Sequence, residues 1–116
     1  MRPKKARVKK QCDKKWSEKI RSKGYCEAKE LGGCKGILNA CHIIRRGANA
    51  LRHDLDNGIC LCVAHHYWFD KGNKFEVTRW FEDKYPGRYD RLKERDIIVH
   101  YKLHDFEEIK KELDDC

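Results

Sequence analysis

Paired cysteine and histidine residues constrain this chain more than any other feature of its sequence. Cys26 and Cys34 flank a glycine-rich turn, and Cys62 forms a C-x-x-H pair with His65 farther along the chain. Two such pairs match a tetrahedral zinc site with three thiolates and one imidazole. Only 40% of the 116 residues are hydrophobic and another 40% are charged, so the apolar core must be modest. We therefore predict that a structural Zn²⁺ on these four side chains holds the fold together.

The zinc prediction has alternatives. Free cysteines also pack in protein cores as small hydrophobic residues, and the seven residues between Cys26 and Cys34 exceed the usual two to four. Cys60 lies on the same strand face as Cys62 and could replace one of the ligands, as could Cys41. The odd number of cysteines, together with an N-terminus that lacks an apolar export segment, favours a reducing cytoplasm over a disulfide framework.

Charge is distributed unevenly along the chain. The formal net charge is +8, and residues 1–23 hold eleven Lys and Arg against two acids. A basic lobe of this kind attracts polyanions, of which nucleic acid is the leading candidate. No apolar run is long enough to span a membrane, so we expect a soluble protein without a membrane partner.

The chain is expected to form one domain of the α+β class, built from three segments. Residues 1–11 are predicted to be a flexible basic arm, residues 12–72 the core with its zinc knuckle, and residues 73–116 a helical extension packed on that core. The elements predicted for the core are a helix from about Lys14 to Ser22 capped by Asp13, strands Leu38–Ile44 and Ile59–Cys62, and a helix from Val63 to about Asp70.

The last third of the chain has helical periodicity. Helices are predicted over Phe75–Lys84 and from Arg88 to about Arg95, with a break between them at the Pro-Gly pair. The β-branched segment Ile97–Tyr101 is either a short strand or an extended connection. Asp105 with Glu108 makes a capping box for a final amphipathic helix, whose inward residues are Phe106, Ile109 and Leu113.

Three residues carry the strongest functional signal. His42 follows the first predicted strand, Asn57 comes fifteen residues later, and His66 nine residues after that. With the surrounding sequence over about residues 12–95, this pattern resembles the HNH, or ββα-metal, nucleases, and more narrowly the phage NinG-like recombination and HNH endonucleases. The resemblance implies a small zinc-stapled ββα-metal core, similar to a treble clef, with additional flanking helices, in a phage-encoded protein of the host cytoplasm.

The resemblance also implies roles for these residues. His42 corresponds to the general base that activates water, Asn57 to the residue that braces the loop or orients the base, and His66 to a ligand of the catalytic divalent metal. Mg²⁺, Mn²⁺ and Ni²⁺ are the candidate ions. Cys41 occupies the position where many members carry a metal-binding Asp or His, and a thiolate suits Mg²⁺ poorly.

Helix geometry divides the two adjacent histidines between two metals. Successive helical residues point about 100° apart, so His65 can face the zinc knuckle while His66 faces the catalytic site. Asp70 lies four residues beyond His66 on the same helix face, where it can add a carboxylate ligand. Each residue also has an ordinary structural interpretation: His42 as a buried neutral imidazole, Asn57 as a turn residue and Asp70 as a solvated carboxylate.

Arginines between the first strand and Asn57 supply a phosphate-binding function. Arg46 and Arg52 match arginines of the NinG-like pattern, and Arg45 with the N-terminal lysines adds sequence-independent attraction for DNA. The sequence therefore predicts a metal-dependent DNA endonuclease of phage recombination or packaging, acting as a monomer or weak dimer, with larger phage packaging or recombination proteins as further candidate partners. The alternatives are a catalytically silent zinc-knuckle DNA-binding or packaging accessory protein, and a protein-interaction adaptor.

Overall fold

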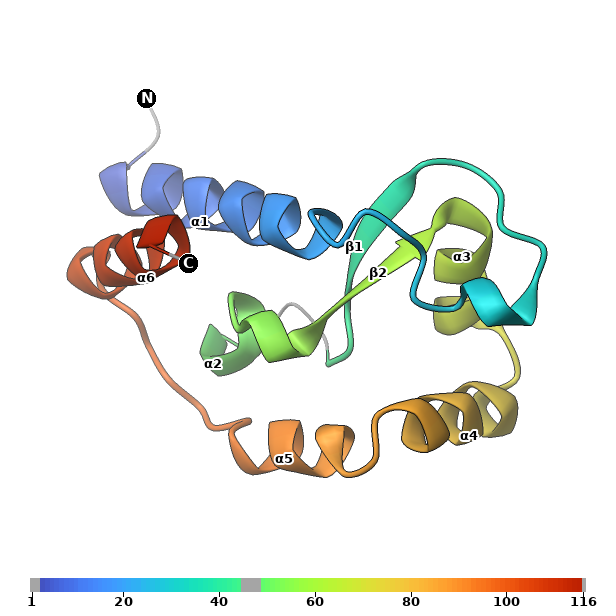
Figure 1. The fold of residues 1–116 in the computed structure, drawn as a ribbon. Coiled ribbons are helices and arrows are strands. Elements are labelled where there is room, and N and C mark those ends of the chain that lie inside the picture. Colours follow the sequence, from blue (N-terminus) through green and yellow to red (C-terminus); the bar gives the residue numbers. More distant parts are fainter. Residues whose placement is uncertain (1–2, 45–48, 116) are drawn as a thin grey trace.

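A long N-terminal helix lies against a short β-hairpin, the C-terminal helix packs beside that first helix, and another helix follows the hairpin directly (Figure 1). The computed structural model describes residues 3–44 and 49–115. Their elements in chain order are α1 (Lys4–Arg21), η1 (Lys29–Leu31), β1 (Leu38–His42), α2 (Asn49–Arg52), η2 (Leu55–Asn57), β2 (Gly58–Cys62), α3 (Val63–Lys71), α4 (Lys74–Lys84), α5 (Arg88–Glu94) and α6 (Leu103–Asp115).

The hairpin positions the functional residues. β1 and β2 pair antiparallel, with Leu38 opposite Cys62 and His42 opposite Gly58. α3 follows β2 directly and ends before Gly72, so β1, β2 and α3 form the predicted ββα unit. The prediction of an α+β fold is thereby confirmed.

Each face of the hairpin has its own hydrophobic core, because side chains alternate along a strand. On one face, a cluster that includes Trp16 and Cys60 joins the hairpin to α1 and α6. On the other face, a cluster that includes Cys41 and Cys62 joins it to the segment after α1 and to Phe81 of α4. Residues 38–42 therefore present their side chains alternately to α1 and to α3.

The close approach of α1 to the hairpin depends on Gly58. A Cβ at this position would overlap the Ile20 side chain and lie 2.8 Å from the Trp16 ring. Only a residue without a side chain lets both bulky groups reach the backbone of β2 opposite His42.

Two predicted boundaries are wrong. α1 begins at Lys4, not near Lys14, so residues 4–11, predicted as part of a flexible arm, are helical, and Asp13 lies inside the helix instead of capping it. The cause is tertiary packing: Val8 and Cys12 extend the apolar stripe of Trp16 and are buried against α6. Likewise α6 begins before Asp105, whose carboxylate accepts a hydrogen bond from the Lys102 backbone N–H.

The other elements match the expected ones closely. Both strands, α3, α4 and α5 lie within a few residues of their predicted bounds, and Phe106 and Leu113 of α6 are buried as expected. Residues 96–102 form an extended connection without strand pairing. Within the described ranges, no helix has the length and apolar character needed to cross a membrane.

Candidate functional site

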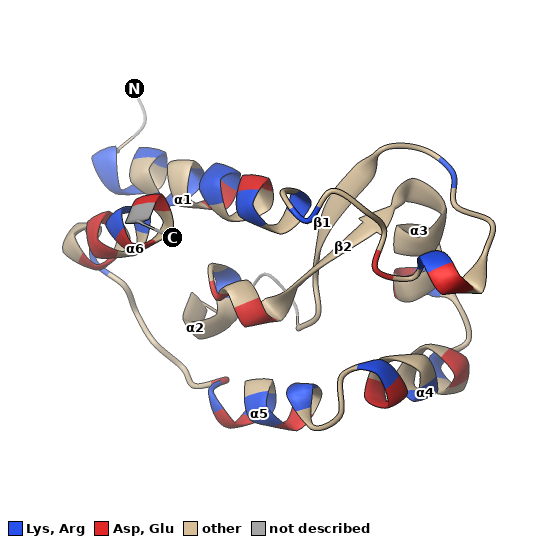
Figure 2. Cartoon of the chain, viewed as in Figure 1, with Lys and Arg blue, Asp and Glu red and all other residues tan. Residues whose placement is uncertain are grey.

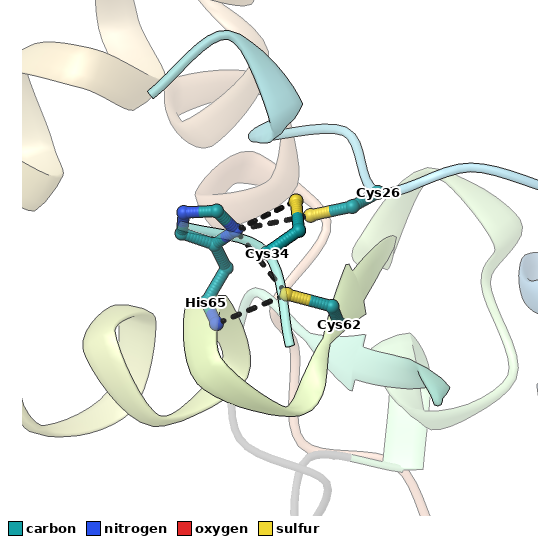
Figure 3. Close-up of side chains that lie close together, drawn as sticks. All are labelled: Cys26, Cys34, Cys62 and His65. Atoms are coloured by element: carbon teal, nitrogen blue, oxygen red, sulfur yellow. Dashed lines mark hydrogen bonds between the residues drawn. The ribbon is translucent and has the colours of Figure 1, made fainter. Parts of the chain in front are cut away.

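Four side chains from separate elements converge at one end of the hairpin (Figure 3). Cys26 precedes η1, Cys34 precedes β1, Cys62 ends β2, and His65 lies in the first turn of α3. The His65 Nδ1 atom is 3.3 Å from the Sγ atoms of Cys26 and Cys62 and 3.5 Å from that of Cys34. All four ligand atoms lie within 4.8 Å of one another. A tetrahedral Zn²⁺ with bonds of about 2.3 Å separates its ligands by about 3.8 Å, so this cluster can hold the ion.

Backbone geometry prepares the cluster for a metal. The Sγ of Cys62 accepts a hydrogen bond from the His65 N–H at 3.4 Å, as the N-cap of α3. Burial alone would raise the pKa of the Cys62 thiol, but hydrogen bonds from the backbone N–H groups of His65 and Lys35 outweigh it and lower that pKa to about 6. Cys62 is therefore largely a thiolate at neutral pH, the form that binds zinc.

The predicted zinc ligands are thus the residues that converge. The alternatives, Cys41 and Cys60, lie outside this cluster and are buried in the two hydrophobic cores of the hairpin. The loop before β1 is held in place by the Val63 N–H, which donates to the Ile37 carbonyl, and by the close approach of Gly36 to the Val63 side chain.

His42 is the last residue of β1, and its ring has a hydrogen bond and a stacking contact. Its Nε2 lies 2.9 Å from the Arg52 carbonyl oxygen, and its ring stacks on the Trp16 indole with centroids 3.9 Å apart and planes 9° apart. Since a carbonyl oxygen only accepts hydrogen bonds, Nε2 carries the proton. In the neutral ring, Nδ1 is then the nitrogen with the lone pair.

The carbonyl that holds His42 belongs to a turn that is anchored to α1. The Asp13 carboxylate accepts hydrogen bonds from Arg52 Nε at 2.7 Å and Nη2 at 2.6 Å, and from His53 Nε2 at 2.7 Å. Burial alone would raise the pKa of Asp13, but these hydrogen bonds hold it well below its usual range. We call Asp13, Arg52 and His53 the Asp13 brace. It fixes the backbone of α2 against α1, and with it the Arg52 carbonyl.

Asn57 closes the loop that follows His42. Its side chain is fully buried, with Oδ1 accepting from the Ile44 N–H at 2.7 Å and Nδ2 donating to the carbonyls of Ile44 and Leu51 at 3.0 and 3.1 Å. These contacts join the chain leaving β1 to the chain entering β2. Asn57 therefore acts on the geometry of the loop, because its three hydrogen bonds go to backbone groups.

The predicted catalytic-metal ligands lie on the other face of β1. Asn39 Nδ2 lies 3.1 Å from His66 Nδ1, and His66 Nε2 lies 3.1 Å from the Asp70 carboxylate. Cys41 is buried beneath them, and its pKa is raised by burial and by the charge of Asp70. In the described part of the chain, Cys41, His66 and Asp70 do not converge on one point as the zinc tetrad does.

The two histidines of the predicted catalytic pair therefore face different neighbours. His42, with Ala40, lines a groove of about 720 Å³ against α1, and His66 does not take part in that lining. His66 contacts Asn39, which lies three residues before His42 on β1 and therefore on the other face of the strand. That both rings serve one catalytic site stays a prediction.

The predicted phosphate-binding arginines have mixed outcomes. The Arg52 guanidinium is bound by Asp13, and Arg45 and Arg46 lie outside the described residues. Arg7 and Lys10, which sequence analysis placed in a flexible arm, belong to α1 and line the His42 groove together with Lys14. The ribbon of α1 carries many basic residues (Figure 2). The four-residue recurrence of Val8, Cys12 and Trp16 is the sequence signal that could have revealed this helix.

Comparison with known proteins identifies the family. Residues 15–73, more than half of the chain, match the family model described as HNH endonuclease. No curated protein and no solved structure matches the chain significantly. The matched segment runs from the Trp16 turn of α1 to the end of α3 and contains His42, Asn57 and the complete cysteine and histidine cluster. The chain belongs to the HNH endonuclease family.

Proposed function

We propose that this protein is a metal-dependent endonuclease that hydrolyses phosphodiester bonds in DNA, with His42 as the general base. The observation that carries the proposal is the imidazole of His42, fixed in tautomer and orientation beside a groove lined by cations. A general base must have its lone pair aimed and its ring immobile, because a proton is transferred only in a defined geometry.

The chain's own residues supply three parts of the chemistry. His42 Nδ1 accepts the proton of the attacking water, the Asp13 brace holds the ring through the Arg52 carbonyl, and Asn57 sets the loop between them. Zn²⁺ on Cys26, Cys34, Cys62 and His65 has a structural role, because four protein ligands leave no open position.

His66 and Asp70 are the residues that would hold the catalytic divalent ion, with Mg²⁺, Mn²⁺ or Ni²⁺ as candidates, whereas the buried Cys41 does not converge with them. The carboxylate and imidazole suit such an ion, and the two lie in contact on one turn of α3. When bound, the ion supplies positive charge that stabilises the transition state of phosphodiester hydrolysis.

The proposal requires a particular path of the DNA past His42 and His66. The two side chains leave β1 and α3 on opposite sides of the hairpin, but His42 is the last residue of its strand. A phosphodiester that crosses the end of β1 can reach both faces, whereas one lying over the middle of the strand reaches only one. The scissile phosphate is therefore placed at the end of β1, next to the loop braced by Asn57.

Cleavage of plasmid DNA tests the proposal. The purified protein should nick or cut a supercoiled plasmid when Mg²⁺, Mn²⁺ or Ni²⁺ is added. His42→Ala should abolish cutting while zinc content, melting temperature and DNA binding stay at the parental level. His100→Ala, which removes an exposed imidazole far from β1 in sequence, is the matched control and should cut normally. Parental cutting by His42→Ala would overturn the mechanism.

A silent DNA-binding module is the second candidate. Two observations favour it: His42 and His66 have different neighbours, and Cys41 is a buried thiol whose raised pKa keeps it neutral and a poor ligand for a hard ion. This alternative predicts tight DNA binding with no cutting in any of the three metals, so the plasmid assay separates the two functions directly.

The resemblance to phage NinG-like proteins supports a finer proposal, a role in phage DNA recombination or packaging. The recombination role predicts a preference for branched or nicked DNA over linear duplex, whereas the packaging role does not require one. Comparing cleavage rates on linear, nicked and branched substrates of the same sequence tests the recombination role, and equal rates on all three would contradict it.

A further inference from the structure

The groove beside His42 is lined along one wall by α1. The residues around it are Arg7, Lys10, Gln11, Asp13, Lys14, Trp16, Ser17, Ala40 and His42. We call it the α1 groove. Arg7, Lys10 and Lys14 are exposed and recur at intervals of three and four residues, so they share one face of the helix. The opposite face carries the buried stripe that packs on α6.

The electrostatics of the groove are positive. Among the described residues of its lining, Asp13 is the one acid, and its carboxylate is bound by Arg52 and His53, which leaves its charge neutralised within the protein. Other lysines of α1 are engaged elsewhere: Lys15 pairs with Asp114, and Lys9 lies over the Phe106 ring.

The three groove cations differ from those lysines. Among the residues that the structure describes, neither Arg7, Lys10 nor Lys14 forms an ion pair with a carboxylate. Their charges therefore remain available to an anionic ligand, and the neutral side chains of Gln11 and Ser17 add hydrogen-bond donors between them.

The spacing of these cations matches the backbone of a nucleic acid. Seven residues of helix separate Arg7 from Lys14 by about 10 Å. Successive phosphates of one DNA strand advance by about 3.4 Å along the duplex axis, so this length covers about three phosphates. Lys14 lies at the His42 end, because its neighbours Asp13 and Trp16 belong to the brace and the ring stack, while Arg7 lies two turns away.

We propose that the α1 groove holds the sugar–phosphate backbone of one strand of duplex DNA, with Arg7, Lys10 and Lys14 binding successive phosphates on the path to His42. The proposal deepens the proposed function and rests on it for the identity of the ligand. In this proposal α1 positions the DNA on the protein. It does so through phosphate contacts, which do not read the base sequence.

The salt dependence of DNA binding tests the groove without cleavage. Both variants are made in the His42→Ala background, with no divalent ion added, and a labelled short DNA duplex is the probe. The groove variant combines Arg7→Gln, Lys10→Gln and Lys14→Gln. The control combines Lys93→Gln, Lys102→Gln and Lys111→Gln, which removes the same charge from exposed positions on and between α5 and α6.

Each lost phosphate contact lowers the slope of log affinity against log salt by about 0.9. The groove variant should therefore lose about 2 to 3 in slope and at least tenfold in affinity near 0.1 M salt, while the control loses less than about 1 in slope. Equal slopes in the two triple variants would overturn the groove. Melting temperatures within a few degrees of the parent establish that both variants fold.

Cleavage kinetics then separate this proposal from the nuclease itself. In the active protein, Lys14→Gln should lower kcat, because it misplaces the strand next to His42, whereas Arg7→Gln should raise KM alone. If the protein binds DNA through the α1 groove but never cuts it, the groove proposal stands and the nuclease proposal is refuted. If the groove variant cuts DNA with parental kcat and KM, the groove proposal is refuted and the nuclease proposal stands.

Discussion

The zinc knuckle and the His42 site hold their side chains by different means. In the knuckle, Cys26, Cys34, Cys62 and His65 point at one another, so a single ion can satisfy all of them. At His42, the ring is held indirectly, through a backbone carbonyl whose residue is tied to α1 by Asp13. A metal cluster of this kind depends on few residues, so the loss of one ligand is expected to abolish metal binding. A braced histidine depends on several hydrogen bonds, so the loss of one is expected to weaken its positioning only in part.

Loss of a zinc ligand gives the largest expected effect. Cys62→Ala removes both a thiolate and the cap of α3, and structural zinc contributes on the order of 10 kcal/mol to small domains. Since small domains are stable by only about 5–15 kcal/mol, the variant should be unfolded at 25 °C and hold no zinc. Circular dichroism and metal analysis measure this, with about one zinc per parental chain expected.

Cys60→Ala is the matched control for that prediction. Cys60 is equally buried and lies two positions earlier on β2, but it packs in the cluster with Trp16 instead of the knuckle. It should fold and retain its zinc. A Cys62→Ala protein with parental zinc content, or a Cys60→Ala protein without zinc, would reassign the ligands.

Asn57→Ala should have the next largest effect. The amide makes three hydrogen bonds in a fully buried position, and its removal leaves the Ile44 N–H and two carbonyls without these partners. Buried unsatisfied groups cost about 1–3 kcal/mol each, so we expect the free energy of unfolding to fall by at least about 3 kcal/mol. Urea denaturation measures this, and a loss below about 1 kcal/mol would contradict the role of Asn57 as a loop brace.

The knuckle was predictable from sequence, and the brace was not. Cysteine and histidine are rare and chemically specific, so their spacing alone indicates a metal site, and the structure brings together the four residues predicted. The brace joins Asp13 to residues about forty positions away, and aspartate in a lysine-rich segment is ordinary. Sequence periodicity indicated the hairpin and α3, but the length of α1 is set by packing against α6, which local pattern alone did not reveal.

Asp13→Asn sharpens the comparison at the His42 site. The amide keeps the size of the side chain but accepts with one oxygen, so it cannot take both hydrogen bonds of Arg52 and that of His53. Loss of charged hydrogen bonds at a partly buried site costs about 1.5–3 kcal/mol. If the brace positions His42, kcat for plasmid cleavage should also fall by about 10-fold or more with KM unchanged, as for other groups that orient a reactive side chain.

Glu30→Gln is the control for Asp13→Asn, because it breaks an ion pair with Lys84 at a site outside the lining of the His42 groove. It should change stability by less than about 1 kcal/mol and leave cleavage at the parental rate. Asp13→Glu, which keeps the charge, should restore part of the kcat. If Asp13→Asn loses stability but retains full kcat, the brace is structural only.

Trp16→Phe has the smallest expected effect and distinguishes the two contacts of this ring. The indole stacks on His42 and donates from Nε1 to the Asp54 carbonyl at 2.9 Å. Phenylalanine keeps an aromatic face for the stack but loses the hydrogen bond, so stability should fall by about 1 kcal/mol while kcat changes by less than about twofold. Trp16→Leu, which fills the core without a flat ring, should lower kcat further at similar stability. Equal kcat in the two variants would show that the Arg52 carbonyl alone orients His42, and that the stack with α1 serves only packing.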